Sequence, residues 1–386
     1  MSRTRSATLH GNSCRTPVYQ TATYFFGSTE EVVEYHRREV MRGRYGRYSN
    51  PNWTDVEASL AEADAAEDAL VFASGMNAIA TTVLALVIPG DTLIYSAACY
   101  RNTRTFFADI LGTLGVATQA FDTADSAGFE ASLDQACRAR RPRVVFLEAP
   151  SNPHLYLVDI RRIRAMLPED TILIVDATFG TPVNMKPCRF GADLVLHSCT
   201  KYLGGHGDIM GGSAAGRRDL IERVRGYRNV LGGVMSPQSA ALLHRSLETL
   251  TLRMAHFNST GLALARHLNA SPHVSRVFYT GLDSHPHKAL ADTYLTGHGG
   301  VVSFEVAGDA AATTRFVEAL EIPYMGSNFG TSMALVEQCG VFTYYHCTAE
   351  ERAALGISDQ LVRYSVGYED APRLIADIEA AFAKTL

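Results

Sequence analysis

Lys201 stands in the sequence where a reactive amine could be held next to an anion. The largely apolar residues 193–197 predict a short buried strand, which ends just before the lysine and is followed by a glycine-rich loop. Ser198 and Thr200 precede the lysine at alternate positions, so both hydroxyls could reach one anion. Open α/β sheets bind their ligands at the carboxyl ends of strands. These residues therefore suit a lysine that is bound covalently to a phosphorylated aldehyde.

The segment around this lysine reads SCTKYLGGHGDIMGG and resembles the lysine motif of the Cys/Met-metabolism enzymes, which use pyridoxal phosphate. That family includes cystathionine γ-synthase, cystathionine γ-lyase, methionine γ-lyase and O-acetylhomoserine sulfhydrylase. For Thr-Lys-Tyr alone, a solvated lysine in a glycine-rich turn would be the better interpretation. Further motifs follow in the family's order over nearly the whole chain, from His10 and Gly11 to the terminal helix, and they favour a cofactor-binding lysine.

The resemblance also implies a fold. It is the aspartate-aminotransferase-like (type I) α/β fold, in which a mostly parallel seven-stranded sheet lies between helices and a smaller C-terminal α+β domain follows. Strands that alternate with helices between about residues 55 and 215 predict the same kind of sheet. We expect three parts: an arm at 1–50 that contacts a partner subunit, a large cofactor-binding domain at 51–235, and a C-terminal domain at 236–386.

Two strand ends are expected to bind the cofactor. An apolar helix begins at Gly75 and Met76, and backbone N–H groups at a helix start form an anion site. The resemblance assigns this turn to the cofactor's phosphate. Asp176 follows another apolar run, where it could cap the next helix or pair with the pyridine nitrogen. We favour the pair, because a protonated ring nitrogen makes the cofactor an electron sink. Thr178 matches a cofactor-binding position of the family.

Tyr100 is the candidate acid. In the family, the corresponding tyrosine stacks on the pyridine ring and helps to protonate the leaving group. Arg101 and Asn102 depart from the family's pattern at the next two positions. They would line the mouth that receives the substrate's γ-substituent, so the departure indicates an unusual leaving group.

A second set of residues is expected to bind the substrate. Asn152 matches a motif in which the asparagine contacts the cofactor's phenolate oxygen and the substrate carboxylate. Arg363 lies in an apolar strand, where a buried arginine is costly unless it is paired. An α-carboxylate would be a bidentate partner, and a structural salt bridge is the alternative. The resemblance places Ser327 on the substrate carboxylate, while Asn328 and Phe329 replace the family's Leu-Gly.

Tyr45 and Arg47 stand two residues apart, so an extended backbone would point both to one side, where they could grip a phosphate. A basic surface loop is the alternative. In the family this pair reaches the neighbour's cofactor across a dimer interface. The resemblance therefore implies a homo-oligomer, expected to be a tetramer built from dimers that share active sites.

Composition narrows the class of protein. The 386 residues are 47% hydrophobic and 19% charged with a net charge of −5, so no basic field indicates nucleic acid or a membrane surface. Seven cysteines are scattered without a CxxC spacing, which argues against a disulfide framework and against a zinc or other metal site. No apolar leader follows the first residues, and we expect a cytoplasmic protein.

Local patterns predict a helix at 53–69, a strand at 70–73 and one long helix from 236 through Arg253.

The combined expectation is a pyridoxal-phosphate-dependent lyase or transferase. Lys201 would hold the cofactor until the substrate amine displaces it and forms an external aldimine. The freed lysine would then remove the α-proton. Loss of the γ-group would leave a β,γ-unsaturated intermediate. The first hypothesis is γ-elimination or γ-replacement on a sulfur amino acid or homoserine ester. The second is a specialised biosynthetic lyase that eliminates an unusual γ-group, for example halide from 4-chloroallylglycine to give propargylglycine. The third is a non-catalytic cofactor-binding protein.

Overall fold

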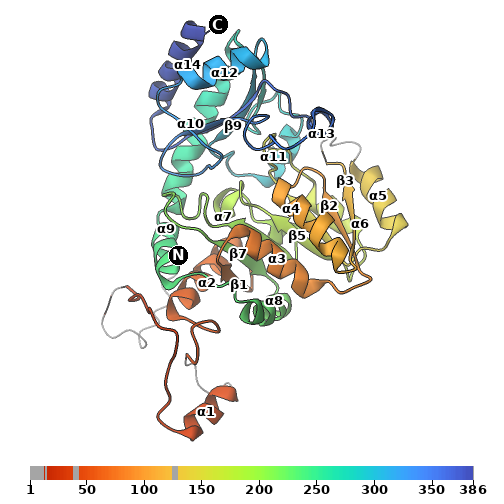
Figure 1. Ribbon diagram of the computed structural model, residues 1–386, viewed down its shortest axis with the longest axis vertical. Helices are drawn as coiled ribbons and strands as arrows, with labels where there is room; N and C mark the ends of the chain where they lie inside the picture. The colour runs from red at the N-terminus through yellow and green to blue at the C-terminus, as the bar shows by residue number, and fades with distance from the viewer. Residues whose placement is uncertain (1–12, 14, 38–42, 124–128, 386) are drawn as a thin grey trace.

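The larger of two β-sheets organises the chain and lies between helices (Figure 1). The computed structural model describes residues 13, 15–37, 43–123 and 129–385. The sheet has seven strands in the order β1-β7-β6-β5-β4-β2-β3. β7 pairs antiparallel with both of its neighbours, and the other adjacent pairs are parallel. This confirms the predicted mostly parallel seven-stranded sheet.

The elements of this part alternate along the chain. The strands are β1 (Asp68–Phe72), β2 (Thr92–Ser96), β3 (Ala117–Phe121), β4 (Val144–Glu148), β5 (Ile172–Asp176), β6 (Leu194–Ser198) and β7 (Gly212–Gly216). The helices are α1 (Thr29–His36), α2 (Pro51–Asp64), α3 (Gly75–Leu86), α4 (Arg101–Thr105), α5 (Phe129–Ala139), α6 (Ile160–Met166), α7 (Thr181–Asn184) and α8 (Arg218–Leu231). A π-helix, η1 (Phe106–Leu111), and a 3₁₀-helix, η2 (Pro187–Phe190), complete them.

Helices cover both faces of the central strands, and the sequence of those strands reflects this. Every residue of β4 and β5 is buried. Val145 and Leu147 of β4 belong to one apolar core, whereas Val144 and Phe146 belong to a second core shared with α3 and α8. A strand that is buried on both faces has a continuous run of apolar residues in its sequence. An acidic residue at the end of such a strand is therefore easy to recognise in the sequence.

The second sheet is formed by the C-terminal part of the chain. Its five strands have the order β10-β11-β12-β9-β8. They are β8 (Val274–Phe278), β9 (Val301–Val306), β10 (Tyr324–Met325), β11 (Leu335–Gln338) and β12 (Leu361–Ser365). The helices are α9 (Pro237–Leu247), α10 (Leu250–Ala270), α11 (Lys288–Tyr294), α12 (Ala310–Ala319), α13 (Ala349–Ala354) and α14 (Ala371–Thr385).

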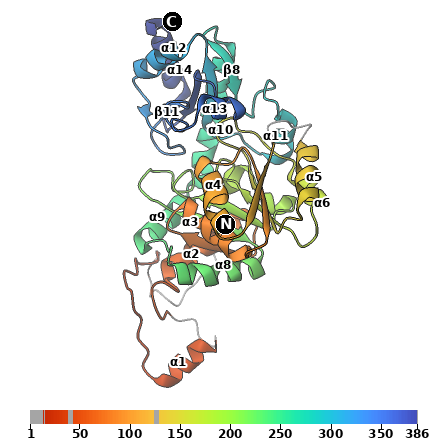
Figure 2. The same cartoon turned by 45° about the vertical axis from the view of Figure 1, so that its right-hand side comes forward.

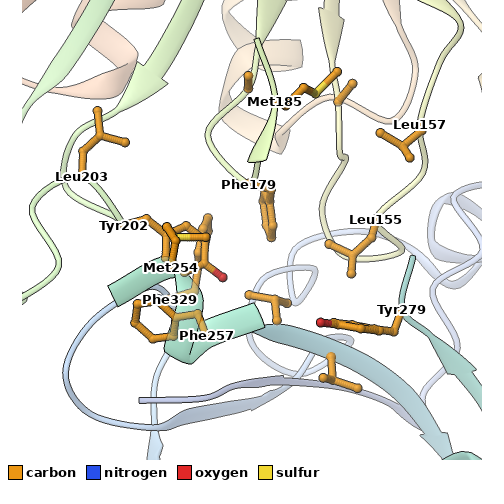
Figure 3. Close-up of a cluster of buried hydrophobic side chains, with 14 of the residues drawn as sticks. Leu155, Leu157, Phe179, Met185, Tyr202, Leu203, Met254, Phe257, Tyr279 and Phe329 are labelled. Atoms are coloured by element: carbon orange, nitrogen blue, oxygen red, sulfur yellow. The ribbon is translucent and has the colours of Figure 1, made fainter. Parts of the chain in front are cut away.

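One apolar cluster joins the two sheets. Phe179, which follows β5, packs toward Tyr202, Phe257 and Phe329 (Figure 3). The ring centroids of Phe179 and Phe329 are 4.2 Å apart. Figure 2 shows the C-terminal elements on one side of the larger sheet and α1 on the other. We propose a domain division near residue 235, supported by the two separate sheets and by α9, which begins there.

Two local predictions were wrong. The helix expected at 53–69 ends at Asp64, because Ala65 adopts a left-handed conformation with φ 56°, and β1 begins at Asp68 to pair with β7. The long helix expected through Arg253 is two helices, α9 and α10. The carbonyl of Ser246 accepts from the Thr249 N–H at 3.2 Å and from Arg253 Nη2 at 2.8 Å, and this tight turn ends the first helix.

The described part of the N-terminal arm projects from the rest of the chain (Figures 1 and 2). α1 has no buried residue, and the ring of Phe25 is 94% exposed. His10 and Gly11 lie outside the described residues. In the described part of the chain, no helix is both long and apolar enough to span a membrane.

Candidate active site

A cavity of about 450 Å³ lies at the carboxyl ends of β4, β5 and β6 and is closed from the other side by β12 and the segment 327–343. Thirteen of the sixteen predicted site residues line it: Gly75, Met76, Tyr100, Arg101, Asn102, Asn152, Asp176, Thr178, Ser198, Thr200, Lys201, Ser327 and Arg363. Asn328 contacts Lys201 from the adjoining position. Tyr45 and Arg47 lie elsewhere. The fold thus gathers residues that are up to about 290 positions apart in the sequence.

Lys201 stands one turn beyond the end of β6, with its backbone N–H 3.2 Å from the Ser198 carbonyl. Its Nζ donates a hydrogen bond to Asn328 Oδ1 and lies 5.0 Å from the centroid of the Phe329 ring. Burial, with a further contribution from the nearby Arg363 cation, lowers the pKa of Lys201 to about 8. At pH 7 roughly one-tenth of this amine is then neutral, far more than at the ordinary lysine pKa, and a nucleophile or base requires the neutral form.

The start of α3 approaches the end of β6 closely. Ser74 caps the helix by accepting from the Asn77 N–H at 3.0 Å. A Cβ on Gly75 would lie 2.9 Å from Ser198 Cβ, so glycine permits this approach. The N–H groups of the first turn and the hydroxyls of Ser198 and Thr200 consequently face the same cavity. This donor set suits a phosphate.

Asp176 ends β5, and its carboxylate is held by Thr178. Asp176 Oδ1 accepts from the Thr178 N–H at 2.9 Å and from Thr178 Oγ1 at 2.6 Å. The same hydroxyl accepts from the Ser198 N–H at 2.8 Å and so links the ends of β5 and β6. Burial raises the pKa of Asp176, and the two hydrogen bonds from Thr178 oppose that rise. A buried carboxylate of this kind gains from a cationic partner in the cavity.

Glu148 is a cavity residue that was not among the predicted ones. It ends β4 directly beside Asp176 in the sheet register. Glu148 Oε2 accepts from the Tyr100 N–H at 2.7 Å, and Oε1 accepts from the Asn152 N–H at 3.1 Å. Burial, followed by the Asp176 charge, raises its pKa to about 8. The signal was present in the sequence, because Glu148 ends an apolar strand just as Asp176 does.

Arg363 projects from the middle of β12 and is 3% exposed. Its Nη1 donates to Asn152 Oδ1 at 2.9 Å, and its Nη2 lies 3.1 Å from Oε1 of the buried Glu337 on β11. The Nη2 contact is an ion pair without hydrogen-bond geometry, so this buried nitrogen has no hydrogen-bond partner among the described residues. The structural salt bridge, the alternative considered from the sequence, is present. Binding of a substrate α-carboxylate by Arg363, which also lines the cavity, stays a prediction.

Tyr100, Arg101 and Asn102 lie at the mouth of the cavity. Tyr100 precedes α4 and is 40% exposed, and its hydroxyl accepts from Asn102 Nδ2 at 3.3 Å. Phe342 and Thr343, which were not predicted, complete this part of the wall. A group attached to a substrate's γ-carbon would meet these polar and aromatic side chains.

Tyr45 and Arg47 lie outside the cavity. The Arg47 guanidinium is 5.4 Å from the Tyr45 ring centroid and 4.8 Å from that of Tyr48, and it donates to the Asn229 carbonyl. The two side chains are adjacent in space, but they lie in a turn in which the Tyr48 N–H donates to the Tyr45 carbonyl at 2.9 Å, and not on the extended backbone that was expected. Its role toward a neighbouring subunit stays a prediction.

The residues present fit pyridoxal phosphate. The cavity combines a phosphate cradle that a Cβ at Gly75 would fill, a buried carboxylate for a ring cation, and, among the described residues that line it, one lysine for an aldehyde. When bound, this cofactor would be held by Lys201, Asp176 and the start of α3, and it would supply an electron sink.

Comparisons with known proteins agree with this reading of the cavity. The family model for "Cys/Met metabolism PLP-dependent enzyme" matches residues 3–383. Cystathionine gamma-synthase 1, chloroplastic, from Nicotiana tabacum is 41% identical over 94% of this chain and 67% of the relative, and the corresponding Arabidopsis thaliana protein, also 41% identical, is spanned over 64% of its length. L-methionine gamma-lyase from Pseudomonas putida is 37% identical over 96% of this chain and 93% of the relative.

A solved structure matches as well. The crystal structure of cystathionine gamma synthase from Xanthomonas oryzae pv. oryzae in complex with cystathionine superposes with a TM-score of 0.89 and 32% identity, over 96% of this chain and 93% of that chain. With most of the chain matched, the predicted fold and cofactor are confirmed. The chain therefore belongs to the Cys/Met-metabolism family of pyridoxal-phosphate-dependent enzymes, and the γ-synthases and γ-lyases among its relatives confirm the predicted reaction class, elimination or replacement at the γ-carbon of an amino acid.

Proposed function

We propose that this enzyme holds pyridoxal phosphate on Lys201 and releases a compact γ-substituent from an L-amino acid whose α-carboxylate binds Arg363. The observation that carries the proposal is that the buried Arg363 lines the same cavity as Lys201 and Tyr100. A substrate carboxylate bound to this guanidinium would fix the amino acid between the lysine and the tyrosine.

The protein's own groups divide the proton transfers between them. With its pKa lowered to about 8, the Lys201 amine can take a proton from the substrate's α-carbon. Asp176, a buried carboxylate in the cavity, would stabilise a cation on the ring of the bound cofactor. The Tyr100 hydroxyl accepts a hydrogen bond from Asn102, so its own proton remains available to a leaving group at the mouth. Asn152 orients Arg363 and completes the carboxylate site.

A second, narrower candidate is the elimination of an unusual small group such as halide. Phe329 lines the cavity, and its ring lies 5.0 Å from Lys201 Nζ and 5.7 Å from Arg363 Cζ. Stacking on Phe179 holds this ring in place. The ring takes up room inside the cavity, which supports a compact substrate over one as long as cystathionine.

A panel of γ-substituted L-amino acids tests both candidates. We would add sulfur, ester and halogenated substrates singly to the purified enzyme and record the absorption of the lysine-bound cofactor together with the release of the γ-group. The narrower candidate predicts fast release of halide and slow turnover of cystathionine and methionine. Rapid turnover of either sulfur substrate would remove the narrower candidate, and absence of a lysine-linked chromophore would remove the whole proposal.

We also propose a homotetramer built from dimers that share active sites, in the cytoplasm. The position of Tyr45 and Arg47 outside their own cavity supports shared sites. The adjoining end of α8 is apolar and exposed, with Val230 81% and Leu231 55% accessible, which supports a covering second copy. The free thiols of the described cysteines support a reducing compartment. Sedimentation would measure the number of subunits. Mixing Tyr45→Phe subunits with Lys201→Ala subunits would test for shared active sites, because activity of the mixture above that of either variant alone requires a site built from both subunits.

A further inference from the structure

Asn328 and Phe329 both contact the amine of Lys201. Asn328 Oδ1 accepts a hydrogen bond from Nζ, and the Phe329 ring centroid lies 5.0 Å from the same nitrogen. An amide oxygen and the face of an aromatic ring both favour an amine that carries hydrogens or a positive charge. The resemblance to the family's Ser-Leu-Gly-Gly motif marked both positions as departures, so these contacts involve residues that the motif does not predict.

The Phe329 ring is held in place by its surroundings. It is 5% exposed, stacks on Phe179 with 25° between the ring planes, and meets the Tyr202 ring edge at 5.6 Å. Arg363 Cζ lies 5.7 Å from the same ring. Because the ring is packed on several sides, the position of the amine next to it is defined as well.

The charges around the amine act in opposite directions. Arg363 on β12 disfavours the ammonium form, and Glu337 on β11 favours it. Asp176, Glu148 and the Tyr100 hydroxyl line the same cavity from the large sheet. Burial lowers the pKa of Lys201, and the Asn328 oxygen and the Phe329 ring are two neutral groups beside Nζ that would favour a proton there.

We propose that Asn328 and Phe329 form a seat for the free amine of Lys201, which positions Nζ whenever the lysine is not bonded to the cofactor. The inference rests on the proposed function, in which Lys201 alternates between a cofactor-bonded and a free state. In the seat, one N–H of the neutral amine points at Asn328 Oδ1, so the lone pair is directed elsewhere and can accept a proton. Once protonated, the amine is stabilised by the same two groups. Asn328 and Phe329 are thus positioning residues for the proton transfer.

The test measures the pKa of Lys201 directly. The chain contains four lysines, Lys186, Lys201, Lys288 and Lys384, which separate into different peptides. We would prepare the full-length enzyme, remove the cofactor reversibly, and measure by mass spectrometry how the rate of acetylation of each lysine depends on pH. Lys288 and Lys384, at exposed ion pairs, serve as internal references.

Substitutions at Asn328 are expected to move this pKa in opposite directions. Asn328→Leu removes the acceptor and should lower the pKa of Lys201 by about one unit. Asn328→Asp places a negative charge on the amine and should raise the pKa by about one unit or more. A merely structural loosening of the loop would move both variants the same way. Phe329→Leu keeps apolar bulk against Phe179 and should lower the pKa by about half a unit.

Met325→Ala is the matched control, because Met325 lies on the neighbouring strand β10 with 60% exposure. It should leave the pKa of Lys201 unchanged. The proposal would be overturned if the pKa of Lys201 were the same in the wild type and in all three seat variants. It would also be overturned if Asn328→Leu and Asn328→Asp shifted this pKa in the same direction.

A separate measurement distinguishes this inference from the proposed function. Borohydride reduction of the loaded enzyme should fix the cofactor on the Lys201 peptide. If no cofactor is found on that peptide, the proposed function fails. If the cofactor is found there but substitutions at positions 328 and 329 do not change the pKa of the free lysine, only the proposal of the seat is refuted.

Discussion

Replacing Glu337 with glutamine should destabilise the enzyme strongly, because Glu337 is the internal counter-ion of Arg363. Both side chains are almost fully buried, at 1% and 3% exposure, and their closest N and O atoms are 3.1 Å apart. Thr343 Oγ1 lies 2.9 Å from each Glu337 oxygen. Removing one partner of a buried ion pair costs about 3–5 kcal/mol, because the other charge is left uncompensated. Glutamine keeps the shape and one acceptor for Thr343, so we expect the lower end, about 3 kcal/mol.

The assay is urea unfolding of the wild type and Glu337→Gln at one protein concentration, with and without glycine, an amino acid that has a carboxylate but no γ-group. In the variant the uncompensated Arg363 cation should bind the added carboxylate more strongly, so glycine should restore part of the lost stability. Glu321→Gln is the control, because Glu321 pairs with Lys384 on the surface and should have no measurable effect. A midpoint for Glu337→Gln equal to that of the wild type would refute the assigned role of the pair.

Three further predictions concern the site and the fold. Tyr100→Phe should lower kcat by about 10²–10⁴-fold with little loss of cofactor absorption, because only the proton donor is removed; a kcat within a few-fold of the wild type would exclude Tyr100 as the acid. Gly75→Ala should weaken cofactor binding measured by titration, since its Cβ would lie 2.9 Å from Ser198 Cβ; Gly226→Ala, where the added Cβ meets nothing within 4 Å, is the control. Burial lowers the pKa of His154 and of His285 to about 4, so the unfolded chain binds protons first as the pH falls; stability should be full above about pH 6.5 and decrease toward pH 4. A urea midpoint that does not change between pH 7 and pH 5 would contradict this assignment.

Much of the site could be predicted because its chemistry lies at strand ends that are visible in the sequence. Lys201 and Asp176 each follow an apolar run, and parallel strands bring such ends to one edge. The covered central strands were recognisable for the same reason, since burial on both faces leaves little choice of residue.

Other features depended on distant partners and left little trace in the local pattern. The break between α9 and α10 follows from a carbonyl that Arg253 and Thr249 share, and the counter-ion of Arg363 comes from the neighbouring strand β11. Glu148 ends an apolar strand as Asp176 does, but the two backbone N–H groups that it binds, those of Tyr100 and Asn152, could be identified only in the structure.

The sequence by itself determined the family, the cofactor, the order of the strands along the chain and the identity of the reactive lysine, because these depend on short segments whose residue types carry their own chemistry. Only the tertiary structure decided what surrounds that lysine. Asn328 and Phe329 looked like two departures from a motif, and the fold of the C-terminal sheet places both against Nζ. A contact between positions more than 120 residues apart depends on how the two sheets pack together, and no local pattern of residues encodes it.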